Sequence, residues 1–268
     1  MQEAITSVQN KSIKQLLLLS QKSRIRKKTG TFVIEGQREL QIAVKSGFEI
    51  LQIYYCQEIV SEQFIRQIQQ QSEGRLECII ISNEVYQKVA YRSSTEGIVS
   101  VVKSKEILIE HLELPEENSL LLVAEAPEKP GNIGALLRTA DAVKADAVIL
   151  ANPKTDLYNP NIIRSSIGCI FSNTVVSGST RQIIDFLQKN HIQIISAALQ
   201  NATNYTTIDY QKSTAIVVGT EDKGLSSDWI EHADHIVKIP MRGAIDSMNV
   251  SVAAGILLYE VDRQRSSK

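Results

Sequence analysis

Short apolar runs alternate with amphipathic stretches along most of this 268-residue chain. Within residues 1–104, the apolar runs are typical of strands and the amphipathic stretches of helices. The strands are "TFVIEG", "EILQIYYC", "LECIIIS" and "GIVSVVK", and the helices are "SIKQLLLLSQ", "QRELQIAVKSG" and "SEQFIRQIQQQ". This alternation predicts a small α/β domain over residues 1–104.

The alternation restarts after an acidic stretch, "SKEILIEHLELPEENS", which contains a proline and predicts a linker at 105–118. Residues 119–268 then form a second expected domain. Its expected strands are "SLLLVAEA", "DAVIL", "SNTVVS", "IQIISAAL", "TAIVVGT" and "HIVKIP", with helices near 132–144, 160–168, 179–190, 225–232 and 248–265. Strands that alternate with helices predict a mostly parallel sheet covered on both faces.

The composition argues against several classes of protein. No apolar run reaches the roughly 18 residues that a membrane-spanning helix needs, and the first residues lack the pattern of a signal peptide. Cys56, Cys78 and Cys169 are scattered without a CxxC pair. They therefore favour neither a disulfide framework nor a metal site, and we expect a cytoplasmic protein without a metal or a membrane partner.

A basic block near the N-terminus contrasts with the formal net charge of −1. It contains no acidic residue and consists of Lys11, Lys14, Lys22, Arg24, Arg26, Lys27 and Lys28. Such a block can bind a phosphate backbone. A solvated helix end with a basic turn explains the same charges equally well.

Three strand-to-helix junctions in the second half are rich in glycine and polar residues. The first, "AEAPEKPGNIGALLRTADA", places Asn132 at the start of a helix and Arg138 further along it. Free N–H groups at a helix N-terminus suit an anion such as phosphate. The alternative is an ordinary helix start with a surface arginine. The spacing is not the G-x-G-x-x-G of a dinucleotide site.

The second junction, "AIVVGTEDKGLSSDW", runs from a buried strand into Gly219, where a missing side chain lets a ligand approach the backbone. The third, "KIPMRGAIDSMNVSVAAGILLYEVDRQR", has a polar loop at 242–249 before an apolar helix. Either junction alone could be a simple turn. Because ligands bind beyond the carboxyl ends of parallel strands, one pocket could collect all three junctions.

Together "NIGALLRTADA", "VVGTEDKGL" and "IPMRGAIDSMNVSVAAGILLYE" resemble the three motifs of the SpoU (TrmH-type) RNA ribose methyltransferases of the SPOUT superfamily, in the same order. The resemblance covers about residues 120–265. The stretch "KKTGTFVIEGQRELQIAVKSG" is similar to the RNA-binding domain, a small ribosomal-protein-like α/β fold, that often precedes this catalytic domain.

The resemblance implies a trefoil-knotted C-terminal domain, a homodimer and an RNA substrate, ribosomal RNA before transfer RNA. It implies S-adenosylmethionine as the cofactor, held mostly by backbone groups. The positions that match the donor pocket are Gly219, Ile239 and Met248. The positions that match the catalytic residues are Asn132, Arg138, Glu221, Ser247 and Asn249.

Transfer of a methyl group from a sulfonium to a 2′-hydroxyl requires in-line alignment and loss of the hydroxyl proton. The family pattern assigns Arg138 to that step, as a base or as a charge that binds phosphate and stabilises the developing alkoxide. The sequence leaves both roles open. It also leaves open an RNA-binding protein without catalysis and a methyltransferase that acts on transfer RNA.

Overall fold

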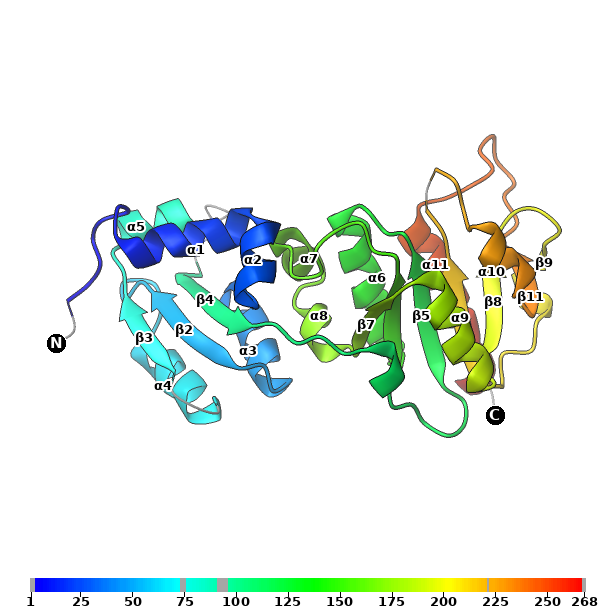
Figure 1. The fold of residues 1–268 in the computed structure, drawn as a ribbon, viewed down its shortest axis with the longest axis horizontal. Coiled ribbons are helices and arrows are strands. Elements are labelled where there is room, and N and C mark those ends of the chain that lie inside the picture. The colour runs from blue at the N-terminus through cyan, green and yellow to red at the C-terminus, as the bar shows by residue number, and fades with distance from the viewer. Residues whose placement is uncertain (1–2, 73–75, 91–95, 221, 267–268) are drawn as a thin grey trace. The chain divides into compact units, whose positions relative to one another are not determined.

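The computed structural model describes residues 3–72, 76–90, 96–220 and 222–266 (Figure 1). By its internal contacts, the chain separates into two compact units. The first unit comprises Met1–Lys105 and Asp156–Ser172, and the second comprises Glu106–Thr155 and Asn173–Lys268. The first unit therefore includes a segment from the middle of the expected methyltransferase domain.

A mixed sheet forms the centre of the first unit, and its described strands have the order β1-β4-β2-β3. The strands are β1 (Thr31–Glu35), β2 (Ile50–Tyr55), β3 (Glu77–Ile80) and β4 (Ile98–Lys103). The helices are α1 (Lys11–Gln21), α2 (Ser23–Thr29), α3 (Gln37–Lys45), α4 (Glu62–Gln71), α5 (Asn83–Val89), α7 (Pro160–Ser165) and α8 (Cys169–Ser172). All four predicted strands are present, and one hydrophobic core joins the sheet to α1 and α5.

The segment Asp156–Ser172 is held in the first unit by aromatic packing. The Tyr158 ring stacks on the fully buried Phe32 ring, with 4.1 Å between the centroids. Phe171 meets Phe48 edge to face at 5.0 Å. Stacked and edge-to-face pairs add to the free energy gained from burying the rings.

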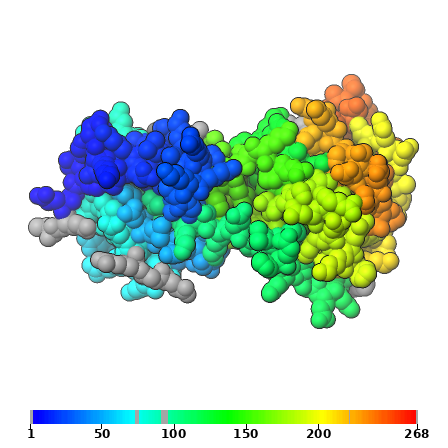
Figure 2. Space-filling model, in the orientation of Figure 1, coloured from blue at the N-terminus to red at the C-terminus, as the bar shows by residue number. Residues whose placement is uncertain are grey.

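Arg26 is buried, unlike the rest of the basic block. Its side chain is 5 % exposed, its Nε lies 2.5 Å from Oδ2 of Asp156, and its Nη1 donates to the Leu19 carbonyl at 2.7 Å. The other six side chains of the block lie on exposed surfaces of α1 and α2, the blue part of Figure 2. Arg26 therefore contributes to the fold of the first unit, and six exposed cations remain that could bind a phosphate backbone.

The second unit is built on a parallel sheet, which confirms the predicted fold class. Among the described residues its strand order is β7-β6-β5-β10-β8-β11-β9, and every pairing is parallel. The strands are β5 (Leu120–Glu125), β6 (Ala147–Ala151), β7 (Val175–Gly178), β8 (Gln193–Ala197), β9 (Thr203–Asn204), β10 (Thr214–Val218) and β11 (His235–Lys238).

Helices cover both faces of this sheet (Figure 1). The strands β5, β6 and β10 are therefore buried at every position. The helices are α6 (Pro130–Ala142), α9 (Thr180–Lys189), α10 (Ser227–Glu231) and α11 (Val250–Ser266), with the short 3-10 turns η1 (Ile109–His111) and η2 (Tyr205–Thr207). The long C-terminal α11 packs against α6 and β10. In the part of the chain that is described, no helix is long and apolar enough to cross a membrane.

Two neighbouring strands, β5 and β10, position the candidate site. They pair in register, with Ala124 opposite Val218 at their carboxyl ends. The loop that leads from β5 into α6 and the loop that leaves β10 therefore start side by side. Ligands of open parallel sheets bind at such strand ends.

Candidate active site

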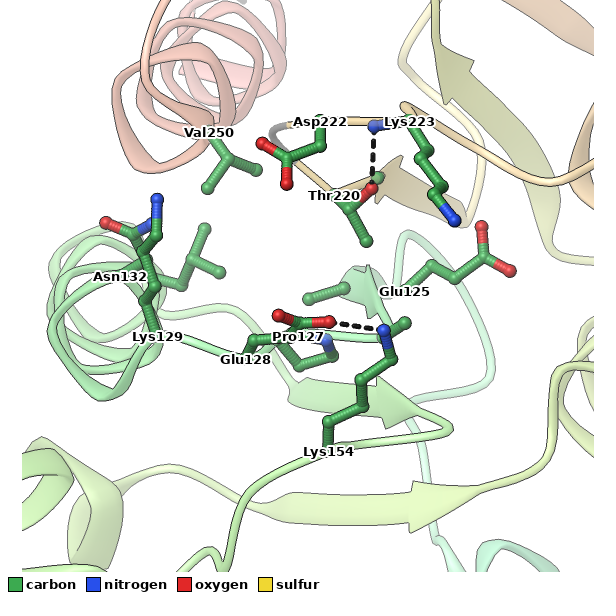
Figure 3. Close-up of a pocket in the computed structure, with 14 residues that line it drawn as sticks. Glu125, Pro127, Glu128, Lys129, Asn132, Lys154, Thr220, Asp222, Lys223 and Val250 are labelled. Carbon is green, nitrogen blue, oxygen red and sulfur yellow. Dashed lines mark hydrogen bonds and ion pairs between the residues drawn. The ribbon is translucent and has the colours of Figure 1, made fainter.

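A pocket at the carboxyl ends of β5 and β10 brings the three glycine-rich or polar junctions together (Figure 3). Asn132 lines it from the first turn of α6, Gly219 from the end of β10 and Val250 from the first residue of α11. Asp222 and Lys154 are among the charged residues of its wall. One pocket therefore collects residues of all three junctions, and the third junction reaches it at Val250 and not through its polar loop at 242–249.

Asn132 and Asn249 contact each other directly at this pocket. The Nδ2 group of Asn249 donates a hydrogen bond to Oδ1 of Asn132 at 3.2 Å. The Oδ1 atom of Asn249 accepts from the backbone N–H and the hydroxyl of Ser251, at 3.0 and 2.5 Å. Asn249 therefore caps α11 and, at the same time, joins the third junction to the first.

The start of α6 suits an anionic group. Pro130 occupies its first turn, where the missing proline N–H removes no helical hydrogen bond. The first turn contains no acidic residue, so the positive end of the helix dipole is not neutralised from within it. Arg138 lies further along α6 with an exposed side chain. Across the described ranges, no hydrogen bond or ion pair joins the Arg138 side chain to another residue.

Gly219 is required by a tight turn. A Cβ atom at this position would lie 2.6 Å from the backbone N of Leu225 and would overlap the backbone of Gly224. Thr220 and Gly224 exchange two backbone hydrogen bonds of 3.1 Å, which fold the loop back over Gly219. The glycine that the sequence assigned to ligand approach therefore also allows its own loop to close.

Of the predicted site residues, Asn132 and Gly219 line this pocket, and Asn249 is joined to it through its hydrogen bond with Asn132. The other described ones do not line it. Ile239, directly after β11, and Met248, directly before Asn249, are half-buried, and Ser247 is exposed. Glu221 lies outside the described residues. The structure thus brings together Asn132, Gly219 and Asn249. The catalytic and donor-binding roles of the other predicted site residues stay predictions.

Two pocket features escaped the sequence analysis. Glu125, the last residue of β5, is a buried carboxylate in the pocket wall. An acidic residue at the end of an apolar strand was the available signal. On the rim, the Lys154 ammonium donates to the Glu128 carboxylate and lowers its pKa. Within the described ranges, no group of three or more His, Cys, Asp or Glu side chains could hold a metal ion.

Two family models match the chain. Residues 10–100 match the MRM3-like substrate binding domain, and residues 119–259, more than half of the chain, match the SpoU rRNA Methylase family. The protein belongs to the SpoU rRNA methylase family. The resemblance drawn from the three motifs is confirmed, as is the presence of an N-terminal substrate-binding domain.

Full-length relatives give the same result. The chain is 31% identical to the 23S rRNA (guanosine(2553)-2′-O)-methyltransferase of Bacillus subtilis, over 96% of this chain and 98% of that one. A crystal structure of an RNA 2′-O ribose methyltransferase aligns with 34% identity and a TM-score of 0.84, over 98% and 100% of the two chains. An AdoMet-bound rRNA methyltransferase from Sinorhizobium meliloti aligns with 25% identity and a TM-score of 0.89, over 97% of each.

Proposed function

We propose that this SpoU-family protein methylates a ribose 2′-hydroxyl of RNA, with S-adenosylmethionine as the methyl donor. The observation that carries the proposal is the contact of Asn132 with Asn249 beside Gly219. The two asparagines come from different family motifs and meet at the strand ends where ligands of parallel sheets bind. A protein that only binds RNA has no need for this convergence.

The residues at the strand ends fit the donor. Gly219 leaves the backbone at the end of β10 uncovered by a side chain, and the Asn132 amide, in contact with Asn249, lies beside it. When bound, the donor supplies an electrophilic methyl group on a sulfonium. Gly219, Ile239 and Met248 would hold it through backbone groups, as the family pattern implies.

Arg138 is the residue we assign to the RNA side of the reaction. Its exposed guanidinium is a cation with a planar fork of hydrogen-bond donors. A fixed positive charge binds the phosphate next to the target ribose and stabilises the alkoxide that develops on O2′. Ser247 and Asn249 would orient the ribose or the arginine.

Ribosomal RNA is the substrate class that the relatives favour. Proteins from Bacillus subtilis and Streptomyces viridochromogenes are named 23S rRNA 2′-O-methyltransferases. Other relatives are named tRNA/rRNA methyltransferases, which leaves the RNA class unspecified. The six exposed cations of α1 and α2 supply a phosphate-binding surface in the substrate-binding domain.

The knot and the homodimer that the family implies are part of this proposal. On α11, Val252 and Tyr259 are both 53% exposed. They are seven residues apart, so they share one face of the helix, and the partly buried Ile256 lies between them. This exposed apolar face on the long C-terminal helix is suited to a second copy of the chain.

The test is to map 2′-O-methyl groups in ribosomal and transfer RNA from cells with and without the gene. We then expect purified protein and labelled donor to restore the missing group on unmodified RNA. One ribosomal position that disappears and is restored would support the proposal. If no position in either RNA changes and the protein does not bind the donor, the proposal fails.

A further inference from the structure

Glu125 accepts hydrogen bonds from two other loops at the strand ends. It is 7% exposed. Its Oε2 accepts from the backbone N–H of Ser226 at 2.8 Å, and its Oε1 accepts from the Ser226 hydroxyl at 2.6 Å. Thr180, the first residue of α9, donates its hydroxyl to Oε1 at a longer 3.4 Å. A buried carboxylate needs such donors to offset its lost hydration.

These contacts fix both ends of the loop that follows β10. At the start of the loop, Val218 pairs with Ala124, and at its end Ser226 is bonded to Glu125. Two consecutive residues of β5 therefore hold the loop. Between these ends the loop contributes Gly219, Thr220 and Asp222 to the pocket wall, and Figure 3 shows Glu125 in the same wall.

The network extends to the next strand. The Asn152 side chain, which follows β6, donates to the Thr180 hydroxyl at 3.0 Å, and its backbone N–H donates to the Gly178 carbonyl at 2.8 Å. Glu125 thus lies where side-chain and backbone hydrogen bonds join the ends of β5, β6, β7 and β10. The loop that follows β10 is therefore bonded to strand ends that are themselves bonded to one another.

We infer that Glu125 is a positioning residue for the methyl donor, which acts by holding the loop between Gly219 and Ser226 in its binding conformation. The inference rests on the proposed function, because it assigns the loop to donor binding. Two oxygens of one carboxylate accept from the two donor groups of Ser226. An amide at position 125 is neutral and has one acceptor oxygen in place of two, so the charge-assisted hydrogen bonds from both Ser226 donors are weakened or rearranged. The loop then samples other conformations, and donor affinity falls.

The experiment compares donor binding and stability in the full-length protein. S-adenosylmethionine is titrated calorimetrically, without RNA, into the parent, Glu125→Gln, Ser226→Ala and the double variant. Asp185→Asn is the matched control, because it makes the same carboxylate-to-amide change on the exposed side of α9. Melting temperature is measured for each, and steady-state assays give the KM for donor, the KM for RNA and kcat.

We expect Glu125→Gln to weaken donor binding by about tenfold, the scale of one hydrogen bond to a charged group. Ser226→Ala should weaken it less, because its backbone N–H still donates. The double variant should weaken donor binding by less than the product of the two single effects, since both changes act on one contact. The KM for donor should rise while the KM for RNA and kcat stay near parent values.

Each outcome is informative. A parent that does not bind the donor overturns the proposed function. A parent that binds it, with Glu125→Gln binding equally well, overturns the positioning role. A lower melting temperature with unchanged donor affinity also overturns it, in favour of a purely structural carboxylate. If Glu125→Gln fails to fold, Ser226→Ala decides, because it leaves the carboxylate and one donor in place.

Discussion

The Nδ2 group of Asn249 donates to the Asn132 side chain across 117 residues of sequence, and the Oδ1 atom of Asn249 caps α11. One residue thus joins two motifs and starts the C-terminal helix. The two roles can be separated, because serine also caps helices but lacks the amide donor.

We expect Asn249→Ala to lose about 1 kcal/mol of stability through the missing cap, along with most of the methyl transfer. Asn249→Ser should recover the stability without recovering the transfer. Chemical denaturation and single-turnover assays measure the two effects. Full transfer by the serine variant would show that the contact with Asn132 is dispensable.

Arg138→Ala should reduce methyl transfer by about two to three orders of magnitude, as the loss of a transition-state charge contact does. Donor affinity should change little, because the exposed guanidinium lies outside the described pocket wall. Arg138→Lys keeps the charge but loses the planar fork. Substantial activity in the lysine variant would favour a simple charge, and its absence would favour paired hydrogen bonds to phosphate or a guanidine base.

Gly219→Ala should lower both melting temperature and donor affinity, since its new Cβ would meet the backbone of Gly224 and Leu225. The control is Gly131→Ala in the first turn of α6, where a Cβ meets open space. Calorimetry and thermal melts compare the two. If Gly219→Ala matched the control in both measurements, the tight turn would not govern the site.

The basic block should divide into two classes. Replacing Lys22, Arg24, Lys27 and Lys28 with glutamine should weaken RNA binding and flatten its dependence on salt, because fewer counterions are released. Arg26→Gln should instead destabilise the first unit by roughly 3 kcal/mol, since it leaves Asp156 without its buried partner. Binding isotherms at several salt concentrations, together with thermal melts, distinguish the classes.

Tyr259→Asp should convert the proposed dimer into monomer, because it places a charge on the exposed apolar face of α11. Asp262→Asn, on the exposed surface of the same helix, is the control and should leave the dimer intact. Light scattering at micromolar concentration measures the mass. A parent protein that is already monomeric contradicts the dimer itself.

The sequence predicted the elements with strong apolar periodicity, including all four strands of the first sheet and the parallel sheet of the second unit. It missed α2, whose basic residues read as a flexible turn, and α5 and α8, which are too short to show a helical period. Local pattern is weak for segments of one or two turns.

At the candidate site, residue types were easier to predict than their contacts. The three motifs pointed to Asn132, Gly219 and Asn249, but nothing in the spacing showed that the two asparagines touch. The need for a glycine at position 219 follows only from the structure, in which the backbone of Gly224 and Leu225 lies where a Cβ would be. The burial of Arg26 depends on a partner 130 residues away, which local charge patterns do not reveal.

The segment Asp156–Ser172 determines when the first unit can finish folding. During synthesis, Phe32 and Arg26 leave the ribosome long before Tyr158 and Asp156, the partners that complete their surroundings. The first unit therefore cannot cover this aromatic ring and this cation until the first part of the second unit, Glu106–Thr155, has been made. For the same reason, a chain cut at residue 104 loses part of the core of its first unit, and a fragment that keeps this core whole must extend through Ser172.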